Sequence, residues 1–341
     1  MERRTAELLI RPSPQCHRPR SRGVSWSVRA DLLGRRLRYG AVIESQPPSS
    51  ALAWAAEVAG PGASAYTVRR LAGGTHAATH LLRTERPTGE MVLRRFPPGD
   101  DAAAREAAVL AALDGLDGWA PRLLDADPAG RRFGEPALLI TRLPGRADIT
   151  SVSARAAAEQ LGRVLARIHA VPLTRLTGLR DGMAAASASS PAGVGAGPTV
   201  SILAAHGHRL AGQRPVLTHY DFWSGNVLWE QQVITGVVDW SGAARAPRGL
   251  DVSWCRLDLR LLHGPDSAEM FLRAYEQAAE TVPDLALWDL FAVQNSYRSV
   301  ETWLPNYHDL GRTDLTAAHL RGRHTSWTQE CLARYRSRQE T

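Results

Sequence analysis

Three oxygen-bearing side chains around two short apolar runs constrain this chain more than any other feature of its sequence. Asp221 and Asn226 lie five residues apart on a polar stretch that leads into the apolar run 227–229. A second apolar run, 233–238, follows, and Asp239 comes directly after it, thirteen residues beyond Asn226. Apolar runs with this spacing predict a pair of short strands. We therefore expect a loop and a strand end to bring the three polar side chains into one site.

This set of side chains suits a magnesium–nucleotide site. Mg²⁺ prefers hard oxygen ligands and usually takes one or two carboxylates together with substrate phosphates. Asn226 and Asp239 could supply the protein oxygens, while Asp221 could orient and deprotonate an acceptor hydroxyl. Phosphoryl transfer needs little beyond such positioning and charge neutralisation. Each residue alone has an ordinary explanation in a turn or at a strand end, but their order and spacing together favour a phosphotransfer site.

The chain contains no lysine, since all 41 of its basic residues are arginine. A phosphate-binding loop of the Gly-Lys-Ser/Thr kind is therefore excluded, and so is a Schiff-base lysine. Any protein clamp on a phosphate must use arginine, backbone N–H groups or a metal. A kinase-like site in this chain must accordingly place an arginine where a lysine is common.

The motif also resembles a known family. His219-Tyr220-Asp221, then Gly225-Asn226, then Val238-Asp239-Trp240 is similar to the catalytic core of the aminoglycoside phosphotransferase and choline kinase-like superfamily, and the likeness extends over about residues 65–305. The resemblance implies a protein-kinase-like α+β fold of two lobes, with a small antiparallel-sheet N-lobe and a larger, mostly helical C-lobe. It also implies that Asp221 is the catalytic base and that Asn226 and Asp239 hold Mg²⁺.

The same resemblance assigns the nucleotide-binding residues. Gly73, Gly74 and Thr75 resemble the short nucleotide loop of the family, in which a glycine turn can lay backbone N–H groups over phosphates. Arg94 resembles the basic strand residue that meets the nucleotide phosphates, and Glu106 resembles the helix glutamate that pairs with it.

The neighbouring Arg95 is the competing choice for this role. Adjacent strand residues point to opposite faces of a sheet, so only one of Arg94 and Arg95 can enter the cleft. We expect it to be Arg94, because Val92 then shares its face and Glu106 follows at a suitable distance.

The charge distribution divides the chain. Residues 1–50 hold ten arginines against four acidic residues, which accounts for six of the seven units of the formal net charge of +7. We expect this stretch to be a disordered arm that does not bind nucleic acid, followed by an N-lobe over 51–143 and a catalytic and acceptor-binding C-lobe over 144–341. The Ala/Ser/Gly-rich stretch 183–200 is typical of a flexible loop.

Apolar periodicity and capping residues give a coarse element map. A strand-rich first part followed by a helix-rich second part is typical of a two-lobe α+β chain. We expect strands at 68–71, 79–83, 90–94 and 137–140, and helices at 101–113, 153–170, 271–279, 287–303 and 316–336.

The three cysteines are widely spaced and form no Cys-x-x-Cys pair, so we expect neither disulfides nor a zinc site. No apolar run reaches the roughly 18 residues that a membrane span needs, and residues 1–30 lack the apolar core of a secretory signal. We therefore expect a cytoplasmic protein that makes no membrane contact.

The sequence thus predicts transfer of the γ-phosphate of ATP or GTP, with Mg²⁺, to a hydroxyl of a small molecule. Two alternatives stay open. One is a metal-dependent phosphoesterase that uses His219, Asp221 and Asp239 directly, although His206-Gly207-His208 is the only His-x-His pair present. The other is a catalytically silent nucleotide-binding protein. The family resemblance offers aminoglycosides, macrolides, choline-like alcohols and homoserine as acceptors without choosing among them, and the oligomeric state is not predicted.

Overall fold

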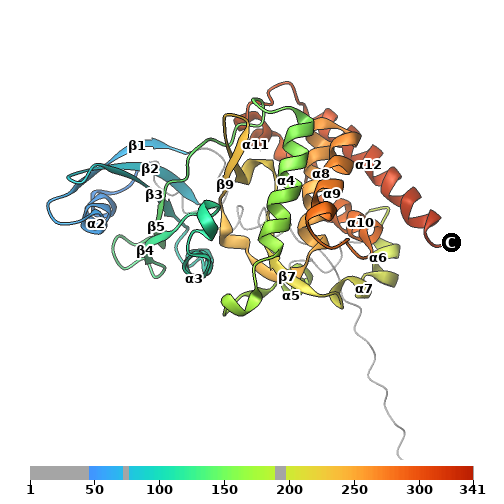
Figure 1. Ribbon diagram of the computed structural model, residues 1–341, viewed down its shortest axis with the longest axis horizontal. Helices are drawn as coiled ribbons and strands as arrows, with labels where there is room; N and C mark the ends of the chain where they lie inside the picture. Colours follow the sequence, from blue (N-terminus) through green and yellow to red (C-terminus); the bar gives the residue numbers. More distant parts are fainter. Residues whose placement is uncertain (1–45, 72–76, 189–196, 341) are drawn as a thin grey trace, which may run out of the picture.

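The chain folds into two lobes that lie side by side (Figure 1). The structure is a computed structural model that describes residues 46–71, 77–188 and 197–340. A five-stranded antiparallel sheet with two flanking helices forms the N-lobe, and helices dominate the larger C-lobe. The predicted two-lobe α+β fold is confirmed. The arm prediction for 1–45 and the loop residues Gly73, Gly74 and Thr75 lie outside the described residues.

The N-lobe sheet has the strand order β1-β2-β3-β5-β4, and every neighbouring pair runs antiparallel. The strands predicted at 79–83, 90–94 and 137–140 fall within it, and the strand predicted at 68–71 overlaps β1, which starts earlier and ends at Arg70. The edge strand β4 has no counterpart among the sequence expectations. The strands are β1 (Ser64–Arg70), β2 (Ala78–Glu85), β3 (Gly89–Arg95), β4 (Leu123–Asp127) and β5 (Ala137–Thr141).

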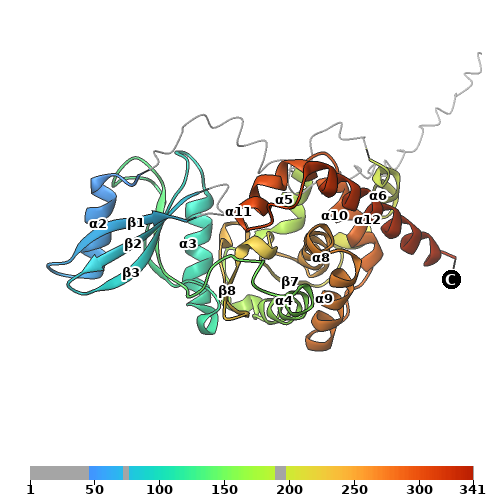
Figure 2. The ribbon, with the colours of Figure 1, turned by 90° about the horizontal axis from the view of Figure 1, so that it is seen from above.

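Side chains alternate across this sheet, so each face has its own apolar core. On one face Leu82, Leu93 and Leu139 pack with Trp54 of α2 (Ser49–Ala59). On the other face, Val92 and its neighbours join the core that contains α3 (Ala102–Leu113). Figure 2 shows α2 and α3 on opposite sides of the sheet. Arg94 shares the α3 face because it follows Val92 by two residues.

Helix α2 begins at Ser49, inside the stretch 1–50 that we expected to be a disordered arm, so that prediction is wrong at its last two residues. Ala51, Trp54 and Ala55 form a stripe with helical spacing, and all three are buried against the sheet. This packing stabilises a helix whose start carries no side-chain cap.

The C-lobe is built from long helices, of which α4 packs on α9, and α8 packs on α9, α10 and α12. The helix predicted at 153–170 is α4, and Ser153 caps it, because the Ser153 hydroxyl accepts the N–H of Ala156 at 3.2 Å. The sequence interpretation did not identify α8, whose apolar and charged residues are buried all round. The helices are α4 (Ala154–His169), α6 (Val200–His206), α7 (His208–Ala211), α8 (Gly249–His263), α9 (Pro265–Ala278), α10 (Leu285–Ser296), α11 (Leu304–Asp309) and α12 (Ala317–Ser337).

Two small sheets carry the loop segments of the site. A three-stranded sheet has the order β6-β10-β7, and the hairpin predicted from the apolar runs is present as β8 and β9. Strand β7 ends directly before His219, and β9 ends shortly before Asp239. The strands are β6 (Arg180–Asp181), β7 (Pro215–Thr218), β8 (Val227–Glu230), β9 (Val233–Val237) and β10 (Ala244–Pro247).

The flexible loop predicted at 183–200 needs a correction at both ends. Residues Gly182–Ala188 form helix α5, and α6 starts at Val200, while 189–196 lie outside the described residues. Alanine is the best helix former, and the Asp181 carboxylate accepts the N–H groups of Met183 at 2.9 Å and Ala184 at 3.0 Å. The alanine-rich composition therefore supports a capped helix here.

The segment that joins the lobes is held close to the β8–β9 hairpin. Arg146 and Trp229 exchange two backbone hydrogen bonds of 3.0 and 2.8 Å, and the Thr235 hydroxyl donates to the Pro144 carbonyl at 2.7 Å. Gly145 has φ 88°, and a Cβ there would lie 2.7 Å from the Trp229 carbonyl oxygen. Only glycine fits this approach without strain.

Within the described part of the chain, no helix is both long and apolar enough to cross a membrane.

Candidate active site

A cavity of about 340 Å³ lies between the lobes, where both contribute to its wall. Its apolar lining suits a planar ring, and its polar lining includes Arg94, Asn226 and Asp239. The apolar side chains that line it are Leu71, Val92, Pro121, Ile140, Leu143, Ala147, Leu228, Val238 and Leu310.

Arg94 connects the N-lobe helix to the end of the C-lobe hairpin. Its Nε donates to Glu106 at 2.9 Å, and its Nη2 donates to Asp239 at 2.7 Å, with the guanidinium almost fully buried. Arg95 turns to the opposite face and donates to Glu135 at 3.0 Å. The structure therefore places Arg94, and not Arg95, against Glu106 at the cavity.

The surroundings of this cluster shift its protonation. Burial raises the pKa of Glu106 to about 7, although the charge of Arg94 acts to lower it. Burial alone would lower the pKa of Arg94, but the charges of Asp239 and Glu106 outweigh it and raise that pKa. Glu106 also accepts the backbone N–H of Trp240 at 3.2 Å, which connects α3 to the residue after Asp239.

The loop that carries Asp221 is held by two buried carboxylates. Asp251 accepts the backbone N–H groups of His219 at 2.7 Å and Tyr220 at 2.9 Å. Tyr220 has φ 71°, a conformation that bulky residues rarely adopt. The two hydrogen bonds stabilise that backbone directly before Asp221.

Asp258 holds the far end of the same loop. It accepts the Ser224 backbone N–H at 3.0 Å, the Ser224 hydroxyl at 2.6 Å and the Tyr307 hydroxyl at 3.0 Å. Asp251 and Asp258 lie seven residues apart on α8, two turns on one helical face. That i,i+7 spacing was the sequence signal for Asp258, a functional residue that the sequence reasoning missed.

Asn226 is oriented by Asp221. Its amide nitrogen donates to the Asp221 backbone carbonyl at 2.8 Å and to the Asp221 carboxylate at 3.3 Å. The amide carbonyl is therefore the atom that Asn226 can offer to a cation. Asn226 and Asp239 both line the cavity, whereas Asp221 lies beyond its wall and is half-buried.

Asp239 lines the cavity, and His219 contacts the segment that leads to it. Asp239 adopts the left-handed conformation, φ 64°, which Asp tolerates better than most residues, and it accepts the Ser241 hydroxyl at 2.8 Å. His219 Nε2 lies 3.0 Å from the Val238 carbonyl, and its ring packs on Trp240. His219 therefore has a hydrogen-bonding role in the structure.

A family model identifies the chain. The model described as the phosphotransferase enzyme family, APH, matches residues 67–288, more than half of the chain. This protein belongs to that family. The match includes every site residue from Arg94 to Asp239, but it ends before α11, whose last residue Asp309 also lines the cavity. The superfamily resemblance of the sequence motif is thereby confirmed.

Solved structures show the same fold at low identity. The macrolide 2'-phosphotransferase MphH from Brachybacterium faecium is 21% identical with a TM-score of 0.50, over 82% of this chain and 98% of that one. The aminoglycoside phosphotransferase APH(4)-Ia is 17% identical with a TM-score of 0.53, over 82% and 98% of the two chains. The aminoglycoside-3'-phosphotransferase of type VIII is 22% identical with a TM-score of 0.50, over 71% and 97%. No curated protein matches the chain.

Proposed function

We propose that this protein transfers the γ-phosphate of ATP or GTP to a hydroxyl of a small molecule in a Mg²⁺-dependent reaction. The observation that carries the proposal is the position of Arg94 between Glu106 and Asp239, at a cavity that Asn226 also lines. The Arg94 guanidinium, the Asp239 carboxylate and the Asn226 amide therefore lie in one wall of the cavity, where the phosphates of a nucleoside triphosphate would bind.

The chain's own residues suit a nucleotide. The apolar lining from both lobes can enclose a purine ring, and Arg94 offers a fixed positive charge that is held by two carboxylates. Arg69 lines the same cavity and can add to the attraction of the phosphates. Gly73, Gly74 and Thr75 remain proposed as the loop over the phosphates.

The residues also fit Mg²⁺. Asn226 presents its carbonyl oxygen because its nitrogen is occupied by Asp221, and Asp239 presents a carboxylate at the same cavity. When bound, Mg²⁺ would neutralise charge on the phosphate oxygens. Among the described residues, no three His, Cys, Asp or Glu side chains gather as a complete metal centre, so phosphate oxygens and waters would have to supply the other ligands.

Asp221 is the proposed base. The loop that carries it is fixed at Tyr220 and at Ser224 by buried carboxylates, so its position is set before substrate arrives. Asp221 would accept the proton of the acceptor hydroxyl as its oxygen attacks the γ-phosphorus. A structure of the related APH(4)-Ia holds ADP and hygromycin B together, which supports a nucleotide and a hydroxyl-bearing acceptor as co-substrates here.

The test is transfer of labelled γ-phosphate from ATP or GTP to a panel of hydroxyl compounds. We expect Asp221→Asn and Asp239→Asn each to lower turnover by at least about 100-fold without loss of folded structure. Asp114→Asn is the matched control, since the Asp114 side chain is mostly exposed on α3's end. Near-normal turnover by Asp239→Asn would overturn the assignment.

Two other outcomes separate the alternatives. Phosphate release without an acceptor would favour the phosphoesterase, and nucleotide binding without consumption would favour a silent binding protein. The His206–His208 pair that the phosphoesterase would need does not line the cavity, and His206 packs near Tyr335 of α12.

A further inference from the structure

His169, the last residue of α4, lies where α4 meets α8 and α9, and its side chain is only 2% exposed. The imidazole has a polar neighbour at each ring nitrogen. Nδ1 lies 2.7 Å from the Tyr275 hydroxyl on α9, and Nε2 lies 3.3 Å from the Asp251 carboxylate on α8. His169 therefore connects two other helices at the carboxylate that holds the loop before Asp221.

The buried imidazole of His169 is neutral at neutral pH. Burial lowers its pKa below the ordinary value of 6.5, although the hydrogen bond to Asp251 and the charge of that residue act to raise the pKa. The charge of Arg248 acts in the same direction as burial. A neutral imidazole carries a proton on one ring nitrogen and a lone pair on the other. One nitrogen of His169 must therefore donate a hydrogen bond while the other accepts one.

The two neighbours decide which nitrogen carries the proton. Asp251 is fully buried, and its carboxylate also accepts the backbone N–H groups of His219 at 2.7 Å and Tyr220 at 2.9 Å. A lone pair on Nε2 would repel that carboxylate, whereas a proton on Nε2 stabilises its buried charge. Burial raises the pKa of the Tyr275 hydroxyl above its ordinary value, so the hydroxyl keeps its proton and can donate it to Nδ1.

We propose that His169 is a positioning residue for the loop that carries Asp221, and that Tyr275 selects the tautomer in which it acts. The Tyr275 hydroxyl donates to Nδ1, and Nε2–H donates to Asp251. Asp251 in turn holds the left-handed backbone of Tyr220. The inference rests on the proposed transfer reaction, in which Asp221 is the base. Because His169 does not line the cavity, its effect should appear in kcat and not in KM for the nucleotide.

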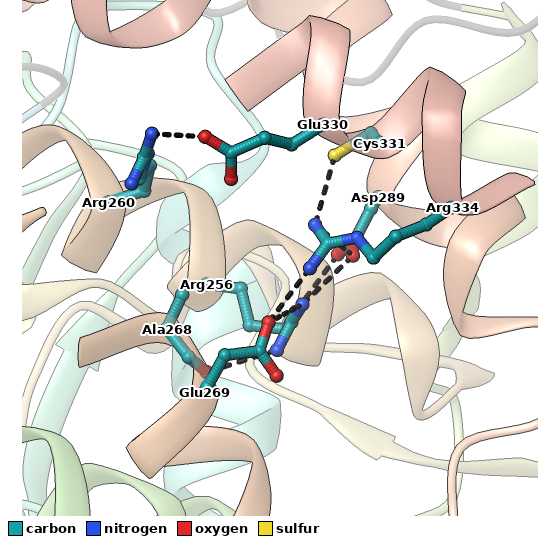
Figure 3. Close-up of polar contacts among 8 residues, drawn as sticks. All are labelled: Arg256, Arg260, Ala268, Glu269, Asp289, Glu330, Cys331 and Arg334. Carbon is teal, nitrogen blue, oxygen red and sulfur yellow. Dashed lines mark hydrogen bonds and ion pairs between the residues drawn. The ribbon is translucent and has the colours of Figure 1, made fainter. Parts of the chain in front are cut away.

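The rest of α8 is held by an ionic network that supplies a control (Figure 3). In this network Arg256 donates to both oxygens of Asp289 at 3.1 Å, and Arg260 donates to Glu330 of α12 at 2.5 Å. Arg260 comes nine residues after Asp251, or about 14 Å along the helix axis. A change at Glu330 therefore loosens α8 far from the loop, without contact to the carboxylate that holds the loop.

A pair of amide variants separates the two contacts of His169. In His169→Gln the amide nitrogen takes the place of Nε2 and can still donate to Asp251, whereas in His169→Asn the amide reaches only the place of Nδ1, next to Tyr275. We expect kcat for phosphate transfer to fall at least about tenfold in the Asn variant and less than about threefold in the Gln variant, with KM for the nucleotide unchanged. Glu330→Gln should lower the free energy of unfolding but leave kcat unchanged. Equal losses of kcat in the two His169 variants, or a similar loss in Glu330→Gln, would overturn the proposal.

A second measurement needs no turnover, so it decides even if His169→Asn fails to fold. Nitrogen NMR of protein with isotope-labelled histidine shows which ring nitrogen carries the proton, and the signals that His169→Gln lacks belong to His169. We expect Nε2–H in the unsubstituted protein and a mixture of tautomers in Tyr275→Phe, which has no hydroxyl to donate to Nδ1. A proton on Nδ1 in the unsubstituted protein would overturn the proposal even if transfer is normal. Absence of transfer by the unsubstituted protein would overturn the proposed function, and the ring-nitrogen signals would still decide the tautomer.

Discussion

At the residue scale, the absence of lysine from the chain means that an arginine, Arg94, contacts the carboxylates at the cavity. A lysine presents one nitrogen, whereas the Arg94 guanidinium meets Glu106 through Nε and Asp239 through Nη2. Arginine can therefore satisfy both carboxylates at once, and it does so with a planar group that is less flexible. The two separate nitrogens explain how one residue of β3 can contact both α3 and the end of the β8–β9 hairpin.

This geometry predicts that Arg94→Lys is not a conservative change. Lysine would keep the charge but lose one of the two contacts, so we expect kcat/KM for the nucleotide to fall about 10- to 100-fold, equivalent to one charge-assisted hydrogen bond. Steady-state kinetics with varied ATP measures it. Arg95→Lys is the control, since Arg95 is equally buried but faces Glu135. An equal loss in the two variants would contradict a special role for Arg94.

At the element scale, the connection between the lobes depends on a close backbone approach. Gly145 combines positive φ with contact to the Trp229 carbonyl, while Gly134 has a similar φ of 86° and no atom within 4 Å of a hypothetical Cβ. A side chain at Gly134 would therefore meet only backbone strain, whereas a side chain at Gly145 would meet both strain and a steric clash.

We expect Gly134→Ala to lower the free energy of unfolding by about 1 kcal/mol, through φ strain alone. Gly145→Ala adds a collision with backbone and should cost more than about 2 kcal/mol. It should also raise KM for the nucleotide, because the segment after Gly145 lines the cavity. Denaturant unfolding and kinetics measure the two effects, and equal destabilisation of the variants would show that the approach to Trp229 tolerates a methyl group.

The sequence predicts those helices correctly that bury only one face, because their apolar residues then recur with the helical period. The starts of α3 and α4 could be predicted from the polar residues before them: the Asp100 carboxylate accepts the Ala102 N–H at 2.8 Å, while Asp101 makes no side-chain cap, and Ser153 caps α4. The prediction failed for α8, because a helix buried on all sides has no polar face to set its period. It also failed for α5, because the alanine-rich composition is typical of a loop as well as of a helix, and the Asp181 carboxylate that caps the helix is recognised only in the folded structure.

At the scale of the whole molecule, Glu106 joins the lobes through Arg94, Asp239 and the Trp240 backbone. Because burial raises its pKa from 4.5 to about 7, the folded protein keeps a proton that the unfolded chain loses between those values. The contribution of Glu106 to stability is thus fully present below about pH 4.5 and is lost as the pH rises to about 7.

We therefore expect the stability of the protein relative to Glu106→Gln to decrease from pH 4.5 to 7, by at most about 3 kcal/mol. Gln does not titrate, so the comparison isolates this one group. Urea unfolding of both proteins at several pH values measures the difference. A difference that stays constant, or grows with pH, would contradict the raised pKa.

The sequence by itself determined the family, the two-lobe fold and the two polar residues Asn226 and Asp239 that line the cavity. Order and spacing suffice for this, because the two residues lie at the ends of one hairpin whose geometry is local, while Asp221 precedes it on the same loop. Strand alternation was also enough to choose Arg94 over Arg95, since the period of two is a local property of the backbone.

The tertiary structure alone decided what holds these residues in place. Asp251 and Asp258 reach the loop 219–226, which carries the proposed base, from a helix more than thirty residues away, and Asp309 reaches the cavity from beyond the family match. The ion pair between Arg260 and Glu330 likewise depends on α12, which packs on α8 only in the folded molecule. Contacts of this kind are set by packing between distant segments, and no local pattern in the chain records them.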